Sequence, residues 1–189
     1  FTRGQNLEKI GQHAGDTSEL FFNDLRVPAD ALLGGVEGQG FVQMMRELPR
    51  ERLIIGVQAV YGAKGALDAT VKYVQERQAF GQAIGQFQNT RFTLAQCASD
   101  IAAAEAFLNA SVAAYERGEL TPEAASALKL HTTEVMGRVA DACLQLFGGY
   151  GYMAEYPISR FWTDARVLRI YGGTSEIMKE LVARSLLGR

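Results

Sequence analysis

The sequence predicts a mainly α protein, in which an antiparallel helical bundle follows a short β segment. Apolar residues recur at helical spacing from Gly38 to the end of the sequence. Start and stop signals, such as Thr121-Pro122 before one apolar stripe and Gly148-Gly149 after it, divide this pattern into successive helices with brief connections. Residues 1–35 instead contain a short run rich in aromatic and branched residues, which is typical of a strand.

The predicted β segment is the stretch from Leu20 to Pro28, which ends at its proline. Leu7 to Ile10 is the predicted partner strand, and Gly11 to Asp16 would connect the two. A two-stranded piece is only marginally stable alone. We therefore expect it to belong to a larger sheet whose other strands lie outside this sequence.

The first helix is expected to begin near Gly38, with apolar stripes over residues 41–48 and 53–74. Pro49 lies between the two stripes. A proline either kinks a helix or occupies its first position, and the second case would place Glu51 in a first turn.

A glycine-bearing break at residues 80–85 precedes a second long helix, whose stripe covers residues 94–112 and ends near Gly118. The third helix has an N-cap and a first-position proline in Thr121-Pro122, and it should stop at Gly148-Gly149. These signals predict two long helices of opposite direction.

Two shorter helices complete the predicted bundle. One follows Pro157, and in it Arg160 and Asp164 are spaced to form an ion pair. The other opens at Thr174 and carries apolar residues over 177–186.

Composition excludes several classes of function. A net charge of −2 argues against a nucleic-acid-binding surface, and no apolar run approaches the roughly 20 residues of a membrane-spanning helix. Cys97 and Cys143 fall on apolar helix faces without CxxC spacing, so we expect buried reduced thiols. His13 and His131 lack partner ligands, so no metal site is predicted.

Two glycine-containing segments are candidate sites. In Arg77–Gly81, followed by Phe87-Gln88, an arginine beside a glycine turn can hold a phosphate, although an arginine here can also simply cap a helix. Gln145–Tyr152 contains three glycines that permit close backbone contact with a ligand, and it is equally explained as a helix stop.

Two further segments carry possible chemistry. In Tyr171–Glu176, two glycines precede a helix N-terminus whose free N–H groups suit an anion or an oxyanion, while the plain alternative is an N-cap at Thr174. Arg46–Arg52 is a charge run of the kind that is usually solvated, yet Glu51 or Arg52 would point inward if one of them joined the apolar face.

Together, in order and spacing, these segments resemble the C-terminal half of acyl-CoA dehydrogenases over essentially the whole sequence. The resemblance implies that residues 1–35 end the middle β-domain and that residues 36–189 form the C-terminal four-helix bundle domain. The N-terminal helical domain and most of the β-domain are then expected outside this sequence. The resemblance also implies an FAD between the β-domain and the bundle, with its ADP end reaching a neighbouring subunit.

The resemblance carries over onto individual positions. It implies that FAD is bound by Arg77, Phe80, Phe87, Gln88, Gln145, Leu146, Phe147, Gly148, Gly149, Thr174 and Glu176. Glu176 stands where many relatives have glutamine. It further implies that the substrate is contacted by Arg52, Tyr171 and Gly172.

The family reaction removes a proton from the substrate α-carbon and passes a hydride from the β-carbon to flavin N5. Most relatives have the glutamate base at the position of Gly172, so this sequence indicates either a dead enzyme or a base from elsewhere. Long-chain and isovaleryl types have it on the first long helix of the bundle, and Leu48–Leu53 matches that motif. Glu51 is therefore the predicted base, and the backbone donor of Gly172 survives the change.

The resemblance also implies an electron-transfer flavoprotein as acceptor, a homodimer or homotetramer, and a role in fatty acid β-oxidation. The expected location is cytoplasmic in a bacterium and the mitochondrial matrix in a eukaryote. Two alternatives stay open, namely a relative that acts on a branched or cyclic acyl-CoA and a helical oligomerisation and FAD-contact module that is inactive on its own.

Overall fold

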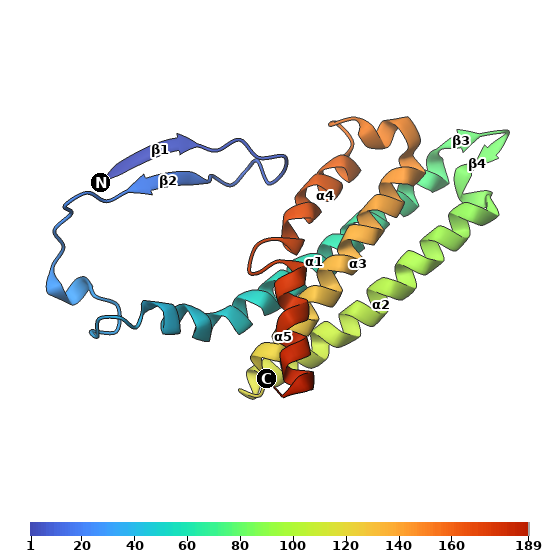
Figure 1. Cartoon of the computed structure of the whole chain (residues 1–189). Helices are drawn as coiled ribbons and strands as arrows, with labels where there is room; N and C mark the ends of the chain where they lie inside the picture. Colours follow the sequence, from blue (N-terminus) through green and yellow to red (C-terminus); the bar gives the residue numbers. More distant parts are fainter. Residues whose placement is uncertain (189) are drawn as a thin grey trace.

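Three long helices lie side by side in alternating directions in the computed structural model, which describes residues 1–188 (Figure 1). They are α1 (Gly40–Glu76), α2 (Gln88–Glu116) and α3 (Pro122–Phe147). The shorter α4 (Pro157–Ala165) and α5 (Ser175–Leu187) both pack against α3, which also contacts α1 and α2. The predicted mainly α fold with an antiparallel bundle is confirmed.

The core of the bundle lies between α1, α2 and α3. On α1, the alanines at 59, 63 and 66 are fully buried, and such small side chains allow another helix to approach closely. Larger apolar residues from the facing helices fill the remaining space, among them Ile101, Leu108, Leu128, Val135 and Val139. Cys97 and Cys143 are both free and buried in this core, as expected.

Helix α1 passes through Pro49 without interruption, so Pro49 does not begin a new helix. Its first turns, before Pro49, extend beyond the other helices in Figure 1 and expose Phe41 and Met44. The part after Pro49 packs against α3 over most of its length. This packing stabilises the helix against the hydrogen bond that proline removes.

The helix ends follow the sequence signals closely. Thr121 caps α3 by accepting a hydrogen bond from the backbone N–H of Ala124 at 3.2 Å, with Pro122 at the first position. Gly148 ends α3 with a positive φ of 58°. The short 3₁₀ helices η3 (Gly148–Tyr152) and η4 (Arg166–Arg169) then connect α3, α4 and α5.

The β segment forms a hairpin, but with different strands from those predicted. The observed pair is β1 (Thr2–Asn6) and β2 (Ser18–Phe21), with Thr2 opposite Phe21. Residues 7–10 belong to the connecting loop, and β2 ends before Phe22. The large apolar side chains of β2 are exposed, so alternation along this strand gave no signal for its limits.

The loop of this hairpin reaches helix α4. The backbone N–H of Gln12 donates to the Asp164 carboxylate, while Arg160 donates to the carbonyl of Ala154 at 3.0 Å. The predicted ion pair between Arg160 and Asp164 is therefore wrong, because each side chain has another partner.

The remaining segments are short. The 3₁₀ helix η1 (Ala29–Ala31) follows the hairpin, and a second hairpin of β3 (Gln78–Ala79) and β4 (Gln82–Ala83) leads through η2 (Ile84–Gln86) into α2. This small hairpin is the glycine-bearing break of the sequence. Among the helices of residues 1–188, none combines the length and the apolar character needed to cross a membrane.

Candidate active site

The candidate residues fall into two groups at different places along the bundle (Figure 1). Arg52 lies in the first half of α1, where it contacts the 171–176 turn, whereas Arg77 is the residue that caps the C-terminal end of the helix. The 25 residues from 52 to 77 correspond to roughly 37 Å of helix. The two groups therefore cannot contact the same small part of a ligand.

The turn before α5 has two glycines in conformations that other residues rarely adopt. Gly172 has φ 65° and Gly173 has φ 104°. Thr174 then caps α5, with its hydroxyl accepting from the N–H of Ile177 at 3.4 Å, which confirms the predicted start of this helix.

Side chains from α1 and α3 hold this turn. Arg52 donates from Nε to the carbonyl of Gly172 at 3.2 Å and from Nη1 to the hydroxyl of Ser126 at 3.1 Å. Lys129 on α3 donates from Nζ to the carbonyl of Gly173. Arg52 is 5% exposed and Lys129 only 1%, so two cations are buried beneath two consecutive glycine carbonyls.

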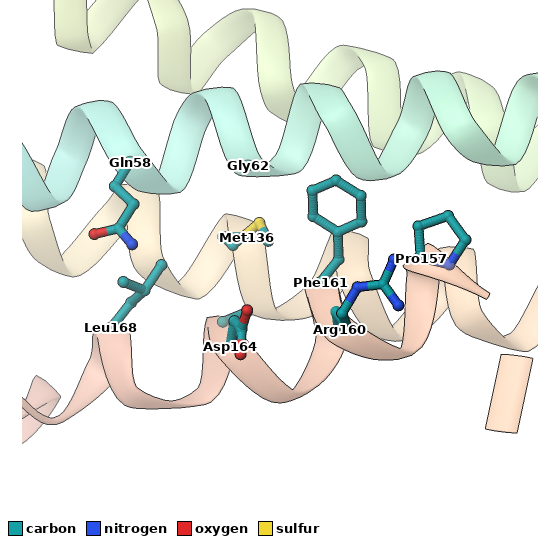
Figure 2. Close-up of a pocket in the computed structure, with 9 residues that line it drawn as sticks. Gln58, Gly62, Met136, Pro157, Arg160, Phe161, Asp164 and Leu168 are labelled. Atoms are coloured by element: carbon teal, nitrogen blue, oxygen red, sulfur yellow. The ribbon is translucent and has the colours of Figure 1, made fainter. Parts of the chain in front are cut away.

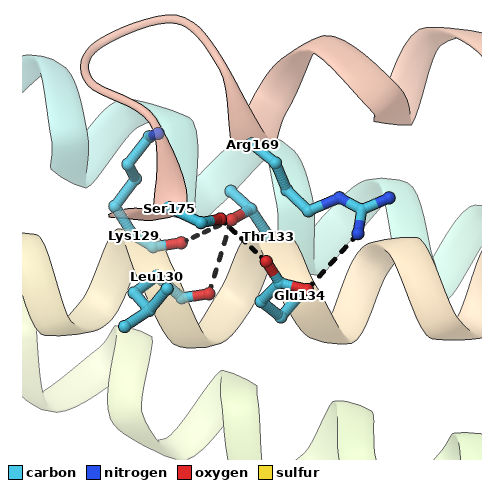
Figure 3. Close-up of polar contacts among 6 residues, drawn as sticks. All are labelled: Lys129, Leu130, Thr133, Glu134, Arg169 and Ser175. Carbon is cyan, nitrogen blue, oxygen red and sulfur yellow. Dashed lines mark hydrogen bonds and ion pairs between the residues drawn. The ribbon is translucent and has the colours of Figure 1, made fainter. Parts of the chain in front are cut away.

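The start of α5 is fixed by a third side chain of α3, Glu134, which Figure 3 shows further along the same helix as Lys129. Glu134 accepts from the hydroxyl of Ser175 at 2.7 Å and from Nη1 of Arg169 at 3.4 Å. The Nε atom of Arg169 is buried and has no hydrogen-bond partner among residues 1–188. Glu134 thus ties α3 both to η4 and to the first residue of α5.

The electrostatics of the turn follow from burial. Desolvation, together with the neighbouring Arg52 charge, lowers the pKa of Lys129 to about 8, although Glu134 opposes the shift. Desolvation also lowers the pKa of Arg52, against the attraction of Glu51. Both groups still carry positive charge at neutral pH, so the turn rests on a positive interior.

One face of α1 lies against the outer side of the turn. The hydroxyl of Tyr171 donates to Oε1 of Gln58 at 2.7 Å. A Cβ atom built on Gly172 would lie 2.7 Å from Cδ1 of Ile55, which is closer than real Cβ atoms approach. Ile55 and Gln58 lie four and seven residues after Glu51, so all three share this face.

Glu51 itself is exposed, and Arg52 is the member of the charge run that points into the core. Arg50 forms only a loose ion pair with Glu47, at 4.0 Å, on the surface. The charge run therefore separates into a buried cation, a solvated pair and the exposed carboxylate of Glu51.

The second group surrounds Arg77. Its guanidinium lies over the ring of Tyr150, 5.1 Å from the ring centre, and the backbone N–H of Arg77 caps α1. A cavity of about 470 Å³ at this end of α1 is lined by Arg77 and by Gln145, Leu146, Phe147, Gly148 and Gly149. The structure therefore brings together the arginine and glycine segments that the sequence singled out separately.

The other predicted residues near Arg77 do not line this cavity. Phe80 is 95% exposed at the tip of the β3–β4 hairpin and meets the ring of Phe87 edge-on at 6.1 Å. Gln88 begins α2. These three residues form an outward-facing edge beside the cavity.

A further cavity, of about 390 Å³, lies between α1 and α4 (Figure 2). Met136, Phe161 and Leu168 give it apolar walls, and Gln58 and Asp164 add polar groups. Gln58 is shared with the turn, because it also accepts from Tyr171. The turn and this cavity are therefore contiguous.

Comparison with known proteins assigns the chain to a family. The family model described as "Acyl-CoA dehydrogenase, C-terminal domain" matches residues 38–187. The chain belongs to the acyl-CoA dehydrogenase family.

Relatives in this family are similar over nearly the whole chain. The mitochondrial long-chain specific acyl-CoA dehydrogenase of Sus scrofa is 46% identical over 99% of this chain and 43% of its own length. An acyl-CoA dehydrogenase structure from Geobacillus kaustophilus has a TM-score of 0.94 and 44% identity, covering 98% of this chain and 48% of that one. A glutaryl-CoA dehydrogenase of Mycobacterium smegmatis in complex with FADH2 has a TM-score of 0.94 and 27% identity, covering 100% and 48%.

The chain thus spans about half the length of the curated relatives that it matches. Within this acyl-CoA dehydrogenase domain, sequence reasoning missed Lys129, Glu134 and Gln58, which all hold the turn. Lys129 could have been noticed in the sequence, because it lies beside Leu128 on the apolar stripe of α3. A lysine is rarely buried, so one at such a position is unusual. For Gln58 and Glu134, no pattern in the sequence indicates their partners more than 40 residues away.

Proposed function

We propose that this chain is the C-terminal domain of an FAD-dependent acyl-CoA dehydrogenase that forms a double bond between the α and β carbons of an acyl-CoA thioester. Glu51 is the proposed general base. The observation that carries this proposal is the overlap that a Cβ atom on Gly172 would have with Ile55, because it disfavours a side chain on the turn beside the face that bears Glu51.

The position of the base follows from that overlap. A side chain at residue 172 would need both a positive φ and a shift of the Ile55 side chain, so the turn as folded disfavours a carboxylate there. Glu51 lies one helical turn before Ile55 on the same face, where the Cβ atoms of such pairs are about 5–6 Å apart. A flexible glutamate there can extend over Ile55 toward the space beside Gly172.

The turn supplies the complementary chemistry. A thioester α-proton is weakly acidic, so negative charge on the carbonyl oxygen must be stabilised while the carboxylate removes the proton. Among residues 1–188, no backbone group accepts from the N–H of Gly172, Gly173 or Thr174, so these donors are free for that oxygen. The buried charges of Arg52 and Lys129 lie behind these donors and favour the same anion.

The residues also fit FAD, with one group suited to its ADP part and a separate group suited to its flavin ring. The cavity beside Arg77 combines a cation with the glycine backbone of residues 148–149, which suits the diphosphate of the ADP part. Thr174 and Glu176 at the start of α5 would contact the flavin ring. When bound, FAD supplies the acceptor for the hydride from the substrate β-carbon.

Glu176 fits the flavin differently from the glutamine of many relatives. Its own backbone N–H and the Thr174 hydroxyl lower the pKa of the Glu176 carboxyl, so it is ionised at neutral pH. A carboxylate only accepts hydrogen bonds. Glu176 would therefore meet an N–H of the flavin and not one of its carbonyl oxygens.

The distance between the two halves supports a homodimer or homotetramer. Roughly 37 Å of helix separates Arg52 from Arg77, which is longer than one extended FAD. The Arg77 cavity would therefore hold the ADP part of an FAD whose flavin lies in a neighbouring subunit. Family membership further supports electron-transfer flavoprotein as the acceptor.

Similarity to the long-chain enzyme of Sus scrofa, which is named as mitochondrial, supports a long-chain acyl-CoA substrate. We place the protein in the mitochondrial matrix of a eukaryote or the cytoplasm of a bacterium. A panel of straight, branched and cyclic acyl-CoA thioesters, compared by kcat/KM, tests the substrate. A branched or cyclic thioester with the highest value would replace the long-chain proposal.

The test of the base uses the FAD-loaded full-length protein. Glu51→Gln should abolish substrate-driven bleaching of the flavin under anaerobic conditions, while FAD content stays unchanged. Glu47→Gln is the matched control, because Glu47 lies one turn earlier on the same face and has only a loose surface partner. Bleaching retained by the Glu51 variant would exclude Glu51 as the base.

A further inference from the structure

The double-glycine turn is held from below by two buried cations, Arg52 and Lys129, which the site proposed above uses only as charges that favour the anion. Lys129 reaches the same turn from a different helix, α3. Within residues 1–188, neither cation forms an ion pair with a carboxylate. Burying such charges is costly unless they are compensated, so a function of the two cations at this turn would explain why they are buried there.

The two carbonyls that they hold determine where the neighbouring N–H groups point. All peptide bonds among the described residues are trans. In a trans peptide, the carbonyl and the following N–H point in opposite directions. Because Gly172 and Gly173 direct their carbonyls at Arg52 and Lys129, the N–H groups of Gly173 and Thr174 point away from the cations.

A turn of two glycines has little conformational preference of its own. Its orientation must therefore come from outside, and each glycine has one external anchor on its carbonyl. The neighbouring anchors act on other atoms, since Gln58 binds the Tyr171 ring hydroxyl and Glu134 binds the Ser175 side chain. Lys129 is the anchor of the Gly173 carbonyl, and Figure 3 shows it extending from α3 toward the turn.

We infer that Lys129 is a positioning residue for the proposed dehydrogenation. It holds the peptide between Gly173 and Thr174, so that the Thr174 N–H, next to the Gly173 N–H that Arg52 orients, is directed at the oxygen that becomes negative. This inference rests on the proposed function. The donors matter most when the thioester oxygen gains charge, and less when the neutral substrate binds. Loss of Lys129 should therefore lower the rate of proton removal more than the affinity for substrate.

The experiment compares Lys129→Met with wild type in the FAD-loaded full-length protein. Flavin bleaching by a long-chain acyl-CoA is followed by stopped flow over a range of substrate concentrations. We expect the limiting rate to fall roughly 100-fold, the size of losing one oxyanion donor, with the half-saturating concentration changed by less than about threefold. The isotope effect with α-deuterated substrate should rise, because proton removal becomes more rate-limiting.

Thr133→Val is the matched control. Thr133 is buried one turn further along α3, and its hydroxyl bonds only to carbonyls of α3 itself. The Thr133→Val substitution therefore perturbs the same core without a contact to the turn. The limiting rate of this variant should stay at the wild-type value. Equal rates in wild type and the Lys129 variant, or equal slowing in both variants, would overturn the inference.

A second variant at residue 129 keeps the test informative if Lys129→Met fails to fold. Lys129→Gln keeps a hydrogen-bond donor without the charge, and we expect a rate between those of wild type and Lys129→Met. If neither Lys129 variant yields FAD-loaded protein, the residue is structural and the inference is wrong. Wild-type protein that no acyl-CoA bleaches would instead refute the proposed function, so the two failures are distinguishable.

Discussion

Replacing Gly172 with alanine should destabilise the protein, and the loss should depend on the side chain at residue 55. Gly172 has φ 65°, where a residue with a Cβ atom costs about 1–2 kcal/mol. The new Cβ would also lie 2.7 Å from Cδ1 of Ile55, and overpacking of this kind costs about 1–3 kcal/mol. The sum is a destabilisation of roughly 2–5 kcal/mol.

Ile55→Val separates the two contributions, because it removes Cδ1 and leaves the backbone unchanged. Alone, this substitution should cost about 0.5–1.5 kcal/mol. Combined with Gly172→Ala, it relieves the overlap and leaves the cost of the positive φ. The double variant should therefore be more stable than the sum of the single losses by roughly 1–3 kcal/mol.

Thermal unfolding midpoints of wild type, both single variants and the double variant measure this coupling. The double variant should unfold at a higher temperature than additivity of the two single shifts requires. Additive shifts would show that Ile55 does not limit the space at Gly172. The proposed reason for moving the base from the turn to α1 would then fail.

Two further predictions concern the charged groups. The pKa of Lys129 is lowered from 10.5 to about 8, so between these values the unfolded chain binds more protons than the native protein. Below pH 8 the native protein bears the full cost of burying the charge of Lys129. As the pH rises from 8 to 10.5, this cost is relieved, and the free energy of unfolding of wild type should rise by up to about 3 kcal/mol. The Lys129→Met variant should not show this rise. Urea unfolding of both proteins across this pH range measures the rise. Parallel plots of unfolding free energy against pH for the two proteins would contradict the prediction. Arg77→Ala should weaken FAD retention, measured by equilibrium dialysis, while Arg91→Ala, an exposed arginine early in α2, should not. Equal retention in both variants would exclude a cofactor role for Arg77.

The helices were predictable because their signals are local. Thr121-Pro122 and Thr174 specify helix starts through caps that act within one turn, and Gly148 specifies an end through its positive φ. Burial of one helix face also leaves a periodic trace in the sequence. These features need no knowledge of the partner helices, and the structure has them where the sequence placed them.

The hairpin and the anchors of the turn were less predictable, for two different reasons. Strand limits depend on pairing and on a buried face, and the exposed side chains of β1 and β2 leave no such pattern. Arg160 and Asp164 have the spacing of an ion pair, but Asp164 accepts instead from Gln12, which is 152 residues away. A contact across that separation has no signature in local spacing.

The candidate base illustrates how the two kinds of information combine. Resemblance pointed to Glu51 because Gly172 lacks a carboxylate, and a glycine at 172 leaves room for a carboxylate that enters from the facing helix. The overlap that a Cβ atom on Gly172 would have with Ile55 adds a physical link, since Ile55 is one turn from Glu51 and also disfavours a side chain on the turn. In the proposed site, a carboxylate on the exposed face and cations beneath the turn would place opposite charges on the two sides of a bound thioester. This arrangement would favour proton removal toward Glu51 and charge build-up toward Arg52 and Lys129 together, as proposed.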